Sequence, residues 1–266
     1  MTASVRQRAS DTPDPFFATT LARGLAVLDA FRGGESSLSN AELAARTGLS
    51  RPTVSRLVNT LLTLGYLKRN ADGHFRLGVR VLGVAYPLLA GYRVRQQARP
   101  MMREFAELAG GAVSIGIADG ANLVYMETAR SSQSFPHVPE VGFAVPLITS
   151  AIGRAAMSLM DADELKAAFA AIEREQPQAY RAGRRNALAG IEACRKDGVC
   201  VALGEWRPEI FAVAAPLLRT PEGDCLAINC GIPAFRITPE AVREDWAPRM
   251  AGLARSIRMM LEREAP

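Results

Sequence analysis

Apolar residues recur at helical spacing in three short segments near the N-terminus. The first spans about residues 20–31 and is followed by a glycine pair, a common stop signal for a helix. The second is LSNAELAARTG, which Ser39 or Asn40 can cap and a glycine can end. The third is SRPTVSRLVNTLL, which follows after a turn of only a few residues. The pattern therefore predicts a cluster of three short helices.

The third segment has two contrasting faces. Its core-facing stripe follows the i, i+3, i+4, i+7, i+8 spacing and consists of Val54, Leu57, Val58, Leu61 and Leu62. Ser50 can cap this helix, and Pro52 fits the first turn, where N–H groups have no intrahelical partner. The opposite face carries Pro52, Arg56, Asn59 and Thr63, flanked by Thr53, Ser55 and Thr60. Taken alone, this polar face is either a solvated surface or a surface that reads a ligand.

A basic hairpin follows the three predicted helices. Residues 66–69 and 74–77 alternate like two short strands, and the sequence Ala-Asp-Gly at 71–73 forms the turn between them. Three short helices and such a hairpin are the elements of a winged helix-turn-helix. The TGLS turn joins the second helix to the third within this motif.

The remainder of the chain mixes strands with helices. Residues 77–110 are helical in pattern, and residues 112–129 alternate like two strands around Asp119-Gly120. Further strands are expected in GVCVALGE, IFAVAAPLL and CLAINCGI, and further helices over 150–160, after the Asp161/Glu164 capping pattern and after Thr238. This order of elements predicts an α+β domain with a central antiparallel sheet.

The net charge is concentrated in the predicted winged helix. The chain has 266 residues and a formal charge of +5. Between residues 40 and 80, seven basic residues (Arg46, Arg51, Arg56, Lys68, Arg69, Arg76 and Arg80) face two acidic ones (Glu42 and Asp72), which also gives +5. A local surplus of this kind is typical of a module that binds a polyanion. A merely solvated basic face is the alternative that charge alone leaves open.

The composition argues against several other classes. MTASVRQRASDTPDP lacks the apolar core of a secretory signal, and no run of about 18 apolar residues could span a bilayer. We therefore expect a cytoplasmic protein that does not enter a membrane. The cysteines, Cys194, Cys200, Cys225 and Cys230, form no C-x-x-C pair, and two histidines are too few for a metal site. We expect reduced, incidental thiols, no metal and no cofactor.

The predicted third helix carries the residue types that read DNA. The major groove admits a helix whose N-terminal residues reach base edges, where Arg suits guanine and Asn suits adenine. Ser, Thr and the N–H groups at a helix start contact phosphates. The candidate DNA contacts are Ser50, Arg51, Pro52, Thr53, Ser55, Arg56 and Asn59 on the helix, and Arg69, His74 and Arg76 on the wing. The conjunction of turn, cap, stripe, polar face, wing and charge favours a reader of double-stranded DNA.

Several blocks of sequence resemble the IclR-type bacterial transcriptional regulators. These are LARGLAVLDAF, AELAARTGLSRPTVSRLVNTLLTLGYL, GHFRLGVRVLGVA, GFAVPLITSAIGRAAMSLM and GVCVALGEWRPEIFAVAAPLL, which together cover nearly the whole chain after residue 17. The resemblance implies a C-terminal GAF-like effector domain and a homodimer or homotetramer on partly palindromic operators. It also implies a repressor or activator of catabolic operons that responds to a small organic acid. The LARGLAVLDAF opening is similar to the subgroup that controls aromatic-acid degradation.

The elements and the resemblance together predict an α+β fold in four parts. These are a flexible tail (1–16), a winged helix-turn-helix DNA-binding domain (17–80), a linker helix (81–98) and a GAF-like α/β effector-binding domain with a central antiparallel sheet (99–266).

The second domain offers candidates for an effector pocket. PLITSAIG brings the Ser150 hydroxyl and small residues to a predicted helix start, where N–H groups and the helix dipole suit a carboxylate. The other positions that the resemblance implies are His137, Val145, Leu147, Ala151, Ile152, Glu205, Ile210, Ala212, Asn229 and Gly231. Asn229 lies in the apolar strand CLAINCGI, where a buried amide needs partners that a ligand could supply. The alternatives are core packing for Val145, Leu147 and Ile210 and a plain loop position for His137.

Departures from the family pattern and two rival functions stay open. Ile148 and the run Trp206-Arg207-Pro208 are unusual for the family, which leaves the identity of the effector open. A cysteine-dependent redox enzyme is one rival, because GAF-like domains can house reactive cysteines, although a thiol catalyst usually needs a nearby base. The other rival is an architectural DNA-binding protein without an effector, which would show no thermal shift with ligand.

Overall fold

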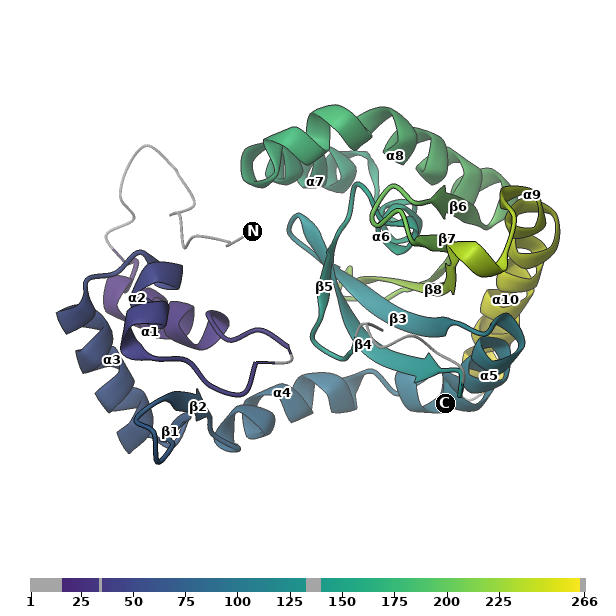
Figure 1. The fold of residues 1–266 in the computed structure, drawn as a ribbon. Coiled ribbons are helices and arrows are strands. Elements are labelled where there is room, and N and C mark those ends of the chain that lie inside the picture. The colour runs from purple at the N-terminus through teal and green to yellow at the C-terminus, as the bar shows by residue number, and fades with distance from the viewer. Residues whose placement is uncertain (1–15, 34, 133–139, 264–266) are drawn as a thin grey trace. The chain divides into compact units, whose positions relative to one another are not determined.

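The computed structural model describes residues 16–33, 35–132 and 140–263 (Figure 1). Contacts within the chain divide it into two compact units, Met1–Gly91 and Tyr92–Pro266. Within the described ranges, no helix is both long and apolar enough to cross a membrane.

The first unit is a three-helix cluster followed by a hairpin and one more helix. Its elements are α1 (Thr19–Asp29), α2 (Asn40–Thr47), α3 (Arg51–Thr63), β1 (Leu67–Arg69), β2 (Phe75–Leu77) and α4 (Arg80–Gly91). The buried core consists of Val27, Ala30, Leu38, Leu43, Val54, Val58, Leu61, Leu67 and Phe75. The apolar stripe of α3 therefore shares one buried core with residues of α1, α2 and the hairpin, as predicted for a winged helix-turn-helix.

Local signals in the sequence fix the ends of these helices. Ser39 accepts a hydrogen bond from the Glu42 backbone N–H (3.2 Å), and the Glu42 carboxylate accepts one from the Ser39 backbone N–H (2.8 Å). This capping box starts α2, and Gly48 ends it in the left-handed conformation (φ 69°). The first helix ends at Asp29, ahead of the glycine pair that was predicted to stop it.

The hairpin is anchored to the helices by backbone hydrogen bonds. β1 and β2 are antiparallel, with Leu67 opposite Leu77. Leu38, just before α2, exchanges two 2.8 Å backbone hydrogen bonds with Phe75 of β2. The wing is therefore a small three-stranded arrangement, which gives it more support than a two-stranded hairpin has alone.

The second unit is built on one six-stranded antiparallel sheet. Its strands are β3 (Ala112–Asp119), β4 (Asn122–Arg130), β5 (Ala144–Pro146), β6 (Cys200–Leu203), β7 (Ile210–Arg219) and β8 (Cys225–Pro233), in the order β5-β4-β3-β8-β7-β6. Every pairing is antiparallel, so the predicted central antiparallel sheet is confirmed. The two central strands, β3 and β8, pair with each other although they are far apart in the sequence.

Helices cover the two faces of this sheet. They are α5 (Val94–Ala109), α6 (Ala151–Met157), α7 (Ala162–Glu175), α8 (Pro177–Asp197), the single turn α9 (Pro239–Ala241), a π-helical turn (Val242–Trp246) and α10 (Ala247–Arg263). Tyr125, Ala214 and Ala227 of the sheet share a core with α6, α7 and α8. Because successive strand residues point to opposite faces, the neighbours of these residues face the other way, where α5 and α10 pack on β4 and β7 (Figure 1).

The predicted helical stretch between the units is two helices. The chain leaves helical geometry between Gly91 and Val94, so α4 ends where the first unit ends and α5 belongs to the second unit. Tyr92 and Arg93 form the break.

Candidate functional site

The exposed face of α3 gathers polar and basic side chains. Val54, Val58 and Leu61 are buried on one side of the helix. The candidate contacts exposed on the other side are Arg51, Pro52, Ser55, Arg56 and Asn59, while Ser50 precedes the helix and Thr53 is half-buried. The sequence therefore segregates the two faces along the whole helix, and the polar face turns to solvent.

Neighbouring hydrogen bonds fix the start of α3. The Asn40 side chain donates to the Ser55 hydroxyl (2.9 Å), which joins α2 to α3 across the turn. The Ser50 and Thr53 hydroxyls share a hydrogen bond of 2.9 Å. Ser50 occupies the cap position, but the expected bond from its hydroxyl to the helix backbone is not formed. These three hydroxyls therefore position the helix, whereas Arg56 projects from its exposed face.

The three candidate residues of the wing lie on the hairpin with distinct local contacts. The Arg69 guanidinium lies over the Phe75 ring, 5.1 Å from its centre. Arg76 donates to the Asn70 side chain (3.1 Å). The His74 ring nitrogen Nδ1 lies 3.4 Å from the Asp72 carboxylate, so this side of the ring faces its own turn.

The second unit contains a cavity of about 280 Å³ that is partly open to solvent. The cavity is lined by Gly110, Gly111, Ala112, Ser114, Tyr125, Ser150, Ala151, Ala202, Glu205, Trp206, Arg207, Glu209, Ile210, Ala212, Asn229, Gly231 and Pro233. These residues come from the sheet strands, from the turn between α5 and β3, from the start of α6 and from the loop between β6 and β7. One surface thus combines apolar walls with a few polar groups, which is the usual character of a small-molecule site.

The structure brings seven of the predicted effector residues to this cavity and places three others elsewhere. The lining includes Ser150, Ala151, Glu205, Ile210, Ala212, Asn229 and Gly231. Val145, Leu147 and Ile152 are fully buried in the core formed with α6, α7 and α8, which agrees with the packing alternative stated for Val145 and Leu147. His137 lies outside the described residues.

The Ser150 hydroxyl has a local role that its predicted role did not include. It donates to the Pro146 carbonyl (2.7 Å) and accepts from the Gly153 backbone N–H (3.1 Å). Both capacities hold the start of α6, as an N-cap does. Ser150 therefore shapes the cavity wall, while its hydroxyl is engaged within the protein.

Asn229 and Tyr125 form a polar pair at the cavity wall, and only Asn229 was predicted from the sequence. Asn229 on β8 is paired in register with Ser114 on β3, and Tyr125 comes from the next strand. Burial raises the pKa of the Tyr125 hydroxyl, and a hydrogen bond with Asn229 acts in the opposite direction. The Asn229 Oδ1 atom is buried and has no hydrogen-bond partner among the described residues. A buried acceptor of this kind is costly unless something pairs with it.

A buried arginine supports the acidic residue of the lining. Arg154 on α6 is 2% exposed, and its Nη1 lies 3.3 Å from the Glu205 carboxylate. Arg207 follows in the same loop, with its guanidinium over the Trp206 ring at 4.8 Å. Phe143 links Trp206 to Tyr125 through ring contacts at 6.2 Å and 6.4 Å. The lining thus includes an aromatic wall and an exposed guanidinium.

The cysteines have the properties of core residues. Cys194, Cys200, Cys225 and Cys230 are all buried and unpaired. Burial raises the pKa of Cys225 and Cys230, while that of Cys194 is raised first by its hydrogen bond with Cys200 and then by burial. The reactive thiolate is therefore disfavoured at Cys194, Cys225 and Cys230, which weakens the redox-enzyme alternative.

Comparison with known families agrees with both units. The IclR helix-turn-helix domain matches residues 20–71, and the C-terminal domain of bacterial IclR transcriptional regulators matches residues 87–259. The Pca regulon regulatory protein of Pseudomonas putida is 25% identical over 249 residues, which is 92% of this chain and 85% of that protein.

Solved structures show the same fold. An IclR-family regulator from Brucella abortus is 32% identical, with a TM-score of 0.80 over 95% of each chain. An IclR homologue from Microbacterium hydrocarbonoxydans, solved with 4-hydroxybenzoate, is 19% identical, with a TM-score of 0.68 over 91% of this chain and 99% of that one. The Pseudomonas putida relative is a regulatory protein, and the Brucella abortus structure is that of a transcriptional regulator. This chain belongs to the IclR family of DNA-binding transcriptional regulators.

Proposed function

We propose that α3 is the recognition helix of this regulator and that the β1–β2 hairpin contacts the adjacent DNA backbone. The observation that carries the proposal is the exposed face of α3, where Arg56 and Asn59 lie opposite the buried stripe. A helix presented in this way enters the major groove, where its polar side chains meet base edges. Arg69 and Arg76 on the wing supply phosphate contacts, and the hydroxyls of Ser50, Thr53 and Ser55 set the position of the helix.

Substitution of Arg56 tests this assignment. We expect Arg56→Ala to weaken operator binding by about 1–3 kcal/mol and to relax sequence preference at one position. Arg174→Ala is the matched control, because it removes an exposed arginine from α7 of the other unit. Equal affinity of Arg56→Ala and wild type, measured at one fixed salt concentration, would refute the role.

We further propose a homodimer or homotetramer on a partly palindromic operator, with residues 17–80 as the DNA-binding domain, 81–98 as the linker and 99–266 as the effector domain. None of the residues of α4 is buried, and the exposed apolar side chains on and beside it are Val79, Leu82, Val84, Tyr86 and Leu88. Exposed apolar side chains in this number are typical of an association surface, which favours a second copy of the chain as its cover.

Association can be tested in solution. Leu82→Glu places a charge in the proposed contact and should shift the sedimenting species toward the monomer. Wild type should protect two half-sites about 34–36 Å apart, or a multiple of this, in a footprint. A monomeric wild type with a single protected half-site would contradict the proposal.

The cavity of the second unit is the proposed site of a small aromatic acid. An engineered cavity of about 150 Å³ holds benzene, so about 280 Å³ suffices for one substituted ring. Tyr125 and Trp206 supply aromatic surface, and Arg207 supplies donors for a carboxylate. The buried Asn229 Oδ1 offers an acceptor to a ligand hydroxyl. The Pca regulon relative and the homologue that holds 4-hydroxybenzoate support this ligand class.

Calorimetric titration with 4-hydroxybenzoate and benzoate separates the two recognition elements. Wild type should prefer the hydroxylated acid by about tenfold, because only this acid pairs with Asn229. Asn229→Ala should remove the preference for 4-hydroxybenzoate. Arg207→Gln should weaken the binding of both acids. The carboxylate-effector proposal fails when no aromatic or keto acid of a tested set binds wild type.

A further inference from the structure

Two strands of the cavity wall meet at a turn on the opposite end of the sheet. β7 contributes Ile210 and Ala212 to the lining, and β8 contributes Asn229 and Gly231. The strands pair from Ile210–Pro233 at the cavity to Arg219–Cys225 at the turn, with one register shift between Pro216 and Leu218. A shift of either strand at the cavity is therefore carried along a hydrogen-bonded ladder to residues 220–224.

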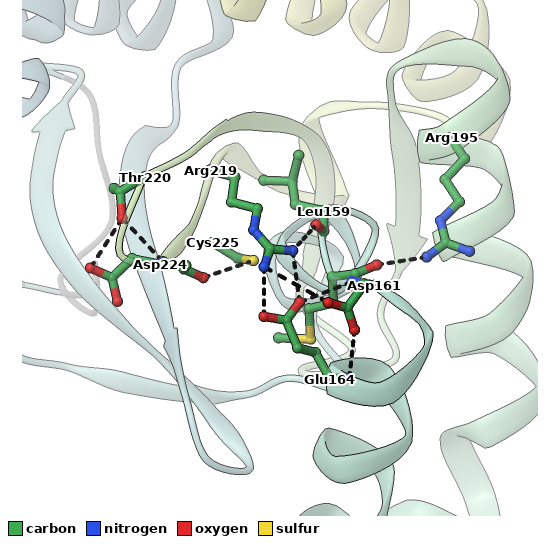
Figure 2. Close-up of polar contacts among 10 residues, drawn as sticks. Leu159, Asp161, Glu164, Arg195, Arg219, Thr220, Asp224 and Cys225 are labelled. Atoms are coloured by element: carbon green, nitrogen blue, oxygen red, sulfur yellow. Dashed lines mark hydrogen bonds and ion pairs between the residues drawn. The ribbon is translucent and has the colours of Figure 1, made fainter.

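The helix of the cavity wall is tied to the same place. α6 begins beside the cavity, and the loop that follows it approaches the end of β7 (Figure 2). Arg219 donates to the Leu159 carbonyl (3.2 Å) and makes two 2.7 Å hydrogen bonds with the Glu164 carboxylate. Arg195 on α8 donates to the Met160 carbonyl in that loop (3.0 Å). A paired, two-pronged arginine contact holds its partners in one fixed geometry.

The turn itself is closed by hydrogen bonds and holds the start of the second unit. Thr220 N–H donates to the Asp224 carbonyl (2.9 Å), and Asp224 N–H donates to the Thr220 hydroxyl (3.1 Å), as Figure 2 shows in part. The Asp224 carboxylate accepts a hydrogen bond from the Tyr92 hydroxyl. Tyr92 directly follows Gly91, the last residue of α4, and precedes α5. The turn thus holds the residue through which the first unit is attached.

We infer that Tyr92 is the coupling residue that transmits occupancy of the cavity to the DNA-binding unit, through its hydrogen bond with Asp224. The inference rests on the proposed effector function of the cavity. Elements that move with the cavity wall, namely β7, β8 and the end of α6, converge on the turn that Asp224 closes. A displacement of this turn moves the Tyr92 hydroxyl, and with it the break between α4 and α5.

If the hydrogen bond between Tyr92 and Asp224 were purely structural, it would stabilise the start of α5 without affecting regulation. Coupling is different, because it is the factor by which the effector changes operator affinity, and by linkage the operator changes effector affinity by the same factor. The test therefore measures three quantities on the full chain: effector affinity, operator affinity, and operator affinity with effector at saturation.

The decisive variant is Tyr92→Phe, which keeps the ring and removes the hydroxyl. With 4-hydroxybenzoate as the probe, wild type should show a coupling factor in the usual range of about 5–150-fold. Tyr92→Phe should reduce this factor by about tenfold, or to unity where it is smaller, while each separate affinity changes by less than about threefold.

Four further variants test whether a loss of coupling comes from the Tyr92–Asp224 hydrogen bond or from misfolding. Asp224→Asn keeps an oxygen that accepts from Tyr92 and should retain coupling, whereas Asp224→Ala should lose it as Tyr92→Phe does. The double variant Tyr92→Phe/Asp224→Ala should be no worse than either single variant, because both remove the same bond. Tyr180→Phe, which removes a hydroxyl from the α8 tyrosine that contacts Phe169, should leave coupling intact.

The outcomes separate this inference from the function on which it rests. Unchanged coupling in Tyr92→Phe, with effector and operator both bound, overturns the inference alone. The same holds when Asp224→Asn loses coupling as fully as Asp224→Ala. Absence of effector binding by wild type overturns the proposed cavity function, and the inference with it.

Discussion

Gly153 allows α6 to lie against the backbone of the loop that precedes it. A Cβ atom at this position would stand 2.3 Å from the Leu147 carbonyl oxygen and 2.4 Å from its Cα. Ordinary contact begins at 3.4 Å, so the loop or the helix would have to move by about 1 Å. The obstacle is backbone, which no side-chain rotation can relieve. Gly153→Ala should therefore displace the cavity wall at Ser150 and Ala151.

The expected magnitude is the difference of two opposing effects. Alanine in place of glycine favours a helix by about 1 kcal/mol, and overpacking of a rigid core costs about 1–3 kcal/mol, occasionally more. Since the overlap involves backbone on both sides, we expect the upper end and a net loss of about 2 kcal/mol. Gly252→Ala in α10 is the matched control, because a Cβ there would meet nothing within 4 Å. It should stabilise the protein by about 0.5–1 kcal/mol.

Tryptophan fluorescence during urea unfolding measures both variants directly. The chain has two tryptophans, Trp206 and Trp246, and both lie in the second unit, so the signal reports on that unit alone. The midpoints should move in opposite directions, and Gly153→Ala should also weaken effector binding. Equal midpoints for Gly153→Ala and wild type would show that the loop yields freely, and the packing argument would be wrong.

Three more predictions follow from other sites. Leu43→Ala leaves a fully buried core position of the first unit partly empty, so the stability of that unit should fall by about 2–5 kcal/mol. The tryptophan transition of the second unit should not change, and a shift of its midpoint would contradict separate unfolding of the two units. Hydrogen bonds from Ser39 lower the pKa of Glu42 from 4.5, so its stabilisation holds above pH 4.5 and is lost as pH falls through the lowered value; circular dichroism should show a shallower acid transition for Glu42→Gln than for wild type. Burial and the bond with Asp224 raise the pKa of Tyr92 from 10.0 to about 12, so its stabilisation holds below pH 10 and is lost between pH 10 and about 12. Tyr92→Phe should flatten that alkaline loss, and an unchanged alkaline profile would count against this assignment.

Local signals explain the elements that were predicted from the sequence. The Ser39/Glu42 and Asp161/Glu164 patterns are both capping boxes in the structure, because each involves only four consecutive residues. The stripe of α3 is buried as its spacing predicts. α8 was not predicted, although Pro177 in its first turn and Gly198 at its end mark both boundaries.

Long-range pairing explains what the sequence did not reveal about the cavity. Tyr125 and Ser114 reach Asn229 only because β3 pairs with both β4 and β8, and no local pattern specifies that order. The available signal was a polar residue inside each apolar strand. Val145 and Leu147 are apolar like several residues of the cavity wall, and only the packing of α6 decides that they lie in the core.

The pairing of β3 with β8 also limits the order in which the two units can fold during synthesis. Ala112 opposes Gly231, so the middle of the sheet cannot form until the ribosome has made most of the second unit. The first unit closes from short-range contacts, such as the hairpin and the Leu38–Phe75 bridge, and topologies of this kind fold faster. The unit that carries the proposed recognition helix can therefore fold before the proposed effector cavity is complete. Under the proposed function, a nascent chain comes under effector control only after β8 has been made and has paired with β3.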